Sequence, residues 1–96
     1  MRYFHRTHLA PDAALEHAAA FFGTRLVPAE ENQRRRTFAG PIGRLTVSAR
    51  PEGGHYTYVM VETDQVGESE MDKLAKRFLT ELHAAVEPAH AVRGAY

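Results

Sequence analysis

The chain has 96 residues, of which 44% are hydrophobic and 25% charged, and its formal net charge is zero. These values are typical of one globular domain, whereas a disordered chain has fewer apolar residues and a larger net charge. Cysteine is absent, which excludes disulfides and thiolate zinc sites. With no apolar run of about 18 residues and no signal peptide at the start, we expect a soluble cytoplasmic protein forming one domain over residues 1–96.

The first elements are a strand and a helix. Residues 2–9 combine aromatic and β-branched types, which predicts a strand. Pro11 and Asp12 suit the first turn of a helix, and Gly23 is a typical residue just past a helix end. Between them, apolar residues recur at helical spacing: Leu15, Ala18, Ala19 and Phe22.

A run of short strands follows, at residues 25–27 (ending before Pro28), 33–39, 43–50 and 55–63. Gly40-Pro41 and Gly53-Gly54 mark the turns between the later strands, and two glycines can supply the positive φ of a hairpin. Leu45, Val47 and Ala49 alternate with polar residues, which indicates a strand with one buried face. Because the connections are short, the sheet is predicted to be antiparallel.

The last element is a long amphipathic helix. Ser69 and Asp72 have the spacing of a capping box at its start, and Pro88 follows its end. Its apolar stripe comprises Met71, Leu74, Ala75, Phe78, Leu82, Ala85 and Val86. Residues 88–96 show no period and are predicted to form an irregular tail.

These elements predict an α+β fold with the order β-α-β(3-4)-α. An antiparallel sheet of four to five strands forms one layer, and two helices on one face of the sheet form the other. Each helix has one apolar face to bury, so both helices are expected on the same side.

Two segments resemble the helix-grip superfamily, which includes START-type lipid-transfer and polyketide cyclase-like domains. The first is the strand-to-helix entry, His8-Leu9-Ala10-Pro11-Asp12-Ala13-Ala14-Leu15. The second is the strand Gly54–Glu62 followed by a loop and an amphipathic helix to Val86. The element order also resembles one repeat of the TATA-box-binding protein. Helix-grip domains are longer, and the pieces that this chain lacks help to form their ligand cavity, so the resemblance implies a fold more than a function.

No motif in the chain indicates catalysis. His5 and His8 lie three apart on a strand and face opposite ways, so they cannot share a metal ion. There is no HExxH pair and no G-x-S-x-G elbow, and Gly40-Pro41-Ile42-Gly43 lacks the lysine of a phosphate-binding loop. We therefore expect no catalytic residues, no metal site and no cofactor.

The sheet face away from the helices is the candidate functional surface. If Val59 and Val61 face the helices, Tyr56, Tyr58 and Met60 lie on the other face, where an antiparallel sheet normally presents polar residues. The basic residues expected there are Arg44, Arg50 and part of Arg34, Arg35 and Arg36. Two alternatives remain open: a reversed register, and a strand buried on both sides.

Three functions could use this surface. A binding module would enclose a small apolar ligand in a cleft walled by Tyr58, Met60, Phe38 and Phe78. A homodimer would pair two such faces, or two edge strands, about a twofold axis. A nucleic-acid-binding domain would use the aromatic residues together with the basic patch of Arg34, Arg35, Arg36, Arg44 and Arg50.

Charge ranks these functions. Residues 1–50 have a balance of +4 and residues 51–96 a balance of −4, and a neutral total disfavours a polyanionic partner. We therefore predict a non-catalytic, helix-grip-like module that forms a homodimer, with a small apolar ligand as a further partner. Nucleic acid is the alternative, and a membrane partner is not expected.

Overall fold

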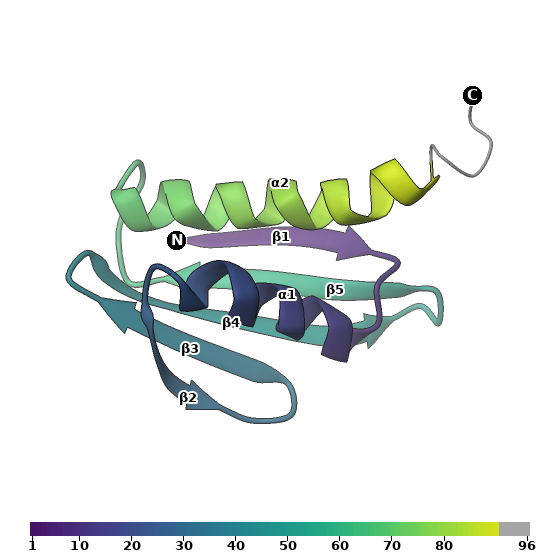
Figure 1. Ribbon diagram of the computed structural model, residues 1–96, viewed down its shortest axis with the longest axis horizontal. Helices are drawn as coiled ribbons and strands as arrows, with labels where there is room; N and C mark the ends of the chain where they lie inside the picture. Colours follow the sequence, from purple (N-terminus) through teal and green to yellow (C-terminus); the bar gives the residue numbers. More distant parts are fainter. Residues whose placement is uncertain (91–96) are drawn as a thin grey trace.

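The computed structural model describes the backbone of residues 1–90 and the side chains of residues 1–85 (Figure 1). The fold is α+β, in the predicted order with four strands between the helices. The elements are β1 (Arg2–Thr7), α1 (Pro11–Gly23), β2 (Val27–Glu31), β3 (Arg35–Gly40), β4 (Gly43–Glu52), β5 (Tyr56–Thr63) and α2 (Glu70–His90). None of the helices described is long and apolar enough to cross a membrane.

The five strands form one antiparallel sheet in the order β1-β5-β4-β3-β2. The N-terminal strand β1 therefore lies beside β5, far away in the sequence, while β2 to β5 are paired in chain order. Figure 1 shows α1 lying across β4 and α2 running alongside β1, and in each case this is the strand that the helix contacts most. The two helices thus cover opposite halves of one sheet face.

The core lies between the helices and this face. A contiguous set of aromatic rings links α1, α2 and β3: the centroids of Phe22 and Phe78 are 5.1 Å apart, those of Phe22 and Phe38 5.4 Å, and those of Phe21 and Phe78 5.8 Å. Aliphatic side chains from the sheet complete it, namely Leu45, Val47, Ala49, Val59 and Val61. This single cluster closes one face of the sheet.

The helix α1 has the predicted bounds, with Pro11 in its first turn. Its buried face is centred differently from the predicted stripe: Ala14 and Phe21 are buried, whereas Ala19 is exposed. The face is wider than an i, i+3, i+4, i+7 stripe because the helix packs on both the sheet and α2.

The strand β2 lies further along the chain than predicted. It begins at Val27 and includes Pro28, whereas a strand at residues 25–27 was predicted. All five of its residues are exposed, it forms an edge of the sheet, and its register shifts between Pro28 and Glu30. A proline without an N–H donor is tolerated at such an edge, so the proline that was taken as a strand end lies inside the strand.

The turn glycines are as predicted at the β4–β5 hairpin. Gly53 and Gly54 have φ values of 65° and 78°, a region that other residues rarely adopt. They return the chain so that Glu52 pairs with Tyr56.

A buried carboxylate fixes the start of α2. The Asp72 N–H donates to the Ser69 hydroxyl oxygen at 3.0 Å, and the Ser69 hydroxyl donates to Asp72 Oδ2 at 2.6 Å, which confirms the predicted cap. Asp72 Oδ1 also accepts hydrogen bonds from the hydroxyls of Thr63 at 2.8 Å and Tyr3 at 3.0 Å. This carboxylate therefore ties α2 to β5 and β1.

These contacts change the acidity of the groups involved. Desolvation raises the pKa of Asp72, but the hydrogen bonds from Ser69, Thr63 and Tyr3 outweigh it, and the net effect is a lowered pKa. Desolvation, followed by the hydrogen bond to Asp72, raises the pKa of Tyr3. Asp72 is thus held as an anion that three hydroxyl groups solvate in place of water.

The apolar stripe of α2 is buried only in part. Met71, Ala75, Phe78 and Leu82 are buried, whereas Ala85 is exposed, and the side chain of Val86 lies outside the described residues. The helix continues to His90, past Pro88, which was predicted to follow its end. Proline has no N–H, so within the helix it forfeits one backbone hydrogen bond. Of the predicted irregular tail, residues 91–96 lie outside the described residues.

Replacing Phe78 by alanine is expected to destabilise the protein by about 3–5 kcal/mol, because the ring is 1% exposed and contacts both Phe21 and Phe22. Urea unfolding at pH 7 measures the loss, with the exposed neighbour Arg77→Ala as control. A midpoint shift no larger for Phe78→Ala than for the control would contradict the packing of α2 on the sheet.

Asp72→Asn is expected to lower the free energy of unfolding at pH 7 by about 1–3 kcal/mol, because it removes a charged acceptor of three hydroxyl hydrogen bonds. Because the pKa of Asp72 is lower in the folded state, its ionisation stabilises the fold at pH values above the unfolded-state pKa of about 3.9. This stabilisation is lost as the pH falls through the folded-state pKa. The difference between wild type and variant should therefore shrink below about pH 4.

Urea titrations from pH 7 to about pH 2 measure this difference. Glu70→Gln is the control, since Glu70 lies in the same helical turn and, among residues 1–85, pairs only with exposed Lys73 at 3.8 Å. A difference in the free energy of unfolding between wild type and Asp72→Asn that stays constant over this pH range would contradict the lowered pKa of Asp72.

Candidate interaction surface on the open sheet face

The sheet face opposite the helices, called the open face here, is covered by none of the described residues. Along β5, Thr57, Val59, Val61 and Thr63 are buried, while the residues between them are exposed or half-buried. Tyr56, Tyr58 and Met60 therefore lie on the open face, as the alternation predicts. Neither a reversed register nor burial on both sides occurs.

The first strand adds an aromatic residue to this face. Phe4 pairs across the strands with Met60, its ring centroid is 5.4 Å from that of Tyr58, and it is 55% exposed. Tyr56 is 45% exposed and contacts the ring of His8 at 4.7 Å. Phe4, Tyr56, Tyr58 and Met60 are called the open-face cluster below.

Two arginines flank the centre of this cluster. The guanidinium carbon of Arg50, on β4, lies 4.7 Å from the ring centroid of Tyr58, and that of Arg6, on β1, lies at 5.5 Å. Cation–π attraction of this kind contributes about 0.5–1 kcal/mol at exposed sites. Tyr58 is thus flanked by two cations and contacts the tilted ring of Phe4.

Other charges on the open face neutralise one another. Arg2 pairs with Glu62 at 3.1 Å, and Arg44 pairs with Glu30 at 3.6 Å. Arg6 donates a hydrogen bond to Glu52, and that bond is the largest cause of a raised pKa for Arg6. Within residues 1–85, Arg35 and Arg50 have no ion pair. The open face therefore has a small positive excess interspersed with acids.

The predicted basic patch is not one surface. Arg35 pairs with Ser48 on the open face, but Arg36 pairs with Val47, which faces the helices, and it forms an ion pair with Glu31 at 3.8 Å. Arg34 precedes β3, and its N–H donates to Asn32 Oδ1. Grouping Arg34, Arg35, Arg36, Arg44 and Arg50 was wrong because consecutive residues of a strand face opposite sides.

The predicted four-walled cleft does not form either. Phe38 and Phe78 are each 1% exposed and lie in the core, whereas Tyr58 and Met60 lie on the open face. The sheet separates the two pairs. Phe38 was misplaced because its own face could not be deduced from the sequence before its pairing with Leu45 was known.

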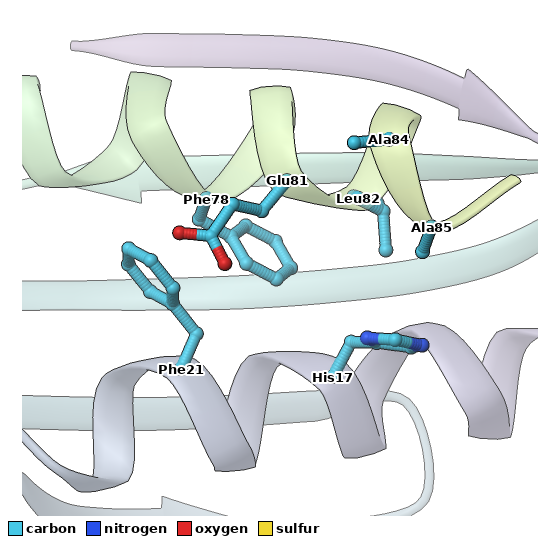
Figure 2. A pocket seen from close by; sticks show the side chains of 7 residues that line it. All are labelled: His17, Phe21, Phe78, Glu81, Leu82, Ala84 and Ala85. Atoms are coloured by element: carbon cyan, nitrogen blue, oxygen red, sulfur yellow. The ribbon is translucent and has the colours of Figure 1, made fainter. Parts of the chain in front are cut away.

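The helices instead leave a shallow groove between them, with a volume of about 320 Å³ (Figure 2). Phe21, Phe78 and Leu82 form its floor and are almost fully buried. Figure 2 shows His17 on α1 and Glu81 on α2 at its sides. Ala84 and Ala85 complete the lining. Little apolar surface is left open here, so the open-face cluster is the larger exposed apolar feature.

The histidines are distributed over several surfaces. His5 on β1 and His83 on α2 contact edge to face at 5.5 Å, and desolvation, then the charge of His83, lowers the pKa of His5. Within the part of the chain that the structure describes, no group of three or more histidine, aspartate or glutamate side chains could hold a metal ion.

No family model, curated protein or solved structure matches this chain.

Replacing Met60 by serine is expected to change the free energy of unfolding by about 1 kcal/mol or less, because Met60 lies half-buried on the open face. Val61→Ser is the matched change on the other face. It should cost about 2–4 kcal/mol, since it leaves a cavity and buries a hydroxyl. Urea unfolding measures both, and equal losses would contradict the assignment of the two faces.

Proposed function

We propose that this protein is a small, non-catalytic, helix-grip-like domain that binds a second copy of itself through the open face. The observation that supports this most is the open-face cluster. One sheet face is closed by two helices, while the other presents Phe4 and Tyr56 to water. Contiguous exposed apolar side chains of this kind mark interaction surfaces.

Residue types and charge favour a second copy as the partner. Tyr, Phe, Met and Arg are enriched in protein interfaces, and all four occur on the open face. Because the face carries both Arg and Glu, two identical copies can meet without the repulsion that two faces of a single sign would cause, which suits the self-complementary surface of an isologous interface. A partner of a single sign of charge would meet repulsion from part of the face.

The area available predicts a weak dimer. Five strands spaced about 4.8 Å apart, each with about six residues at 3.3 Å, present roughly 500 Å² per copy. The total of about 1,000 Å² lies at the low end of specific interfaces. We therefore expect association in the micromolar range rather than an obligate dimer.

Binding of single-stranded nucleic acid is the second candidate, and the flanking of Tyr58 by Arg6 and Arg50 favours it. Sheets that bind single strands use stacked aromatic rings together with cations. Against it, Glu30, Glu52 and Glu62 already pair with three of the arginines. A polyanion would have to compete with these carboxylates, so self-association ranks first.

Sedimentation equilibrium at tens of micromolar is expected to show a wild-type dimer and a monomeric Met60→Glu variant, since a charge at the centre of the face must be desolvated on pairing. Val66→Glu is the matched control, because Val66 is 90% exposed in the loop before α2 and lies off the sheet. It should remain a dimer.

A wild-type protein that stays monomeric at these concentrations would contradict the proposal. If that monomer also binds labelled single-stranded DNA or RNA, with affinity that falls steeply with salt and is lost in Arg50→Ala, nucleic-acid binding takes its place.

A further inference from the structure

We infer that the two copies pair about a twofold axis that runs across the strands, between the positions of Met60 and Tyr58. Each Met60 then packs on Tyr58 of the second copy. This inference rests on the proposed function and specifies how the open faces meet.

The strand register divides the open face into rows that run across the strands. In the order β1-β5-β4-β3, one central row is Phe4, Met60, Ser48 and Arg35, and the next is Arg6, Tyr58 and Arg50. Neighbouring rows on one face lie about 7 Å apart. Outside them, Glu62 and Thr46 form part of one row, and Tyr56 and Glu52 form part of another.

An axis parallel to the strands brings like charges together when it passes directly over β5 or β4. If it passes over β5, it exchanges β1 and β4 and sets Arg6 opposite Arg50 of the second copy. If it passes over β4, Arg50 meets its own counterpart. Like charges brought face to face in an interface cost several kcal/mol. An axis between β1 and β5 avoids this but overlaps only two of the five strands, and an axis on either side of β4 avoids it but leaves one edge strand, β2 or β1, without a partner.

An axis across the strands exchanges rows instead. Placed between the central rows, it sets Met60 against Tyr58 and Ser48 against Arg50 of the second copy. In the outer rows it sets Thr46 against Glu52. All five strands overlap, and none of these rows brings two arginines together. The strands of two packed sheets cross at about 30°. This rotation displaces residues least near the centre of the interface, so the Met60–Tyr58 contact is the best defined.

The strand β4 allows a direct test, because Thr46 and Glu52 both lie on the open face and are six positions apart in the strand. The chain contains no cysteine, so Thr46→Cys and Glu52→Cys each introduce a single thiol. Across the proposed dimer, Thr46 of one copy faces Glu52 of the other, whereas the two Thr46 positions lie roughly 20 Å apart.

A bismaleimide with a span of about 8 Å should cross-link an equimolar mixture of Thr46→Cys and Glu52→Cys, but neither variant alone. Self-cross-linking of Thr46→Cys would overturn the inferred axis in favour of one along the strands. Sedimentation of each uncross-linked variant accompanies the test. A dimer that gives no cross-link in the mixture overturns the inferred axis alone, whereas absence of a dimer in the wild type overturns the proposed function itself.

Discussion

The helices cover one face of the sheet and leave the other face open, and most features of the molecule follow from this difference. In β4 and β5, successive side chains point to opposite faces, so Val47, Val59 and Val61 enter the core while Ser48, Tyr58 and Met60 do not. Both helices are needed to cover the first face, because α1 reaches β3 and β4 and α2 reaches β1 and β5. No described element remains to cover the second.

The first strand, β1, contributes side-chain contacts on both faces of the sheet. On the helix side, Tyr3 donates its hydroxyl hydrogen to Asp72 and so anchors the start of α2. On the open side, Phe4 and Arg6 complete the contacts around Tyr58. Because β1 is an edge strand that pairs with β5, the buried carboxylate also secures the strand that supplies Phe4 and Arg6 to the candidate surface.

Features that depend on neighbouring residues could be predicted from the sequence. The alternation in residues 43–50 and 55–63, the bounds of α1 and the Ser69–Asp72 cap all express local geometry and local hydrogen bonds. The position of β1 beside β5 depends on contacts between residues 50 to 60 positions apart, which no local period encodes. Phe4 and Arg6 were therefore not predicted to belong to the candidate surface.

Sequence patterns also gave wrong predictions for residue types that are equally common in two environments. Arg35 and Arg36 are equivalent in composition but lie on opposite faces, and only the register distinguishes them. Phe38 could line a cleft or a core with equal ease, and its pairing with Leu45 places it in the core. Thr63 gave no sign that it would donate to a buried carboxylate, because the strand and helix that bring the two together are joined by a loop.

The completeness of the core bears on what kind of association the open face supports. Every large buried apolar side chain described belongs to one cluster within a single chain, so folding does not require a second copy. Obligate dimers share a core and bury larger, more apolar interfaces. Here the open-face cluster of four side chains is the apolar part of the open face, and Arg–Glu pairs surround it. These charged groups already attract each other within the monomer. Pairing of two such faces gains energy mainly from removing the open-face cluster from water, and it is therefore governed by concentration rather than by folding.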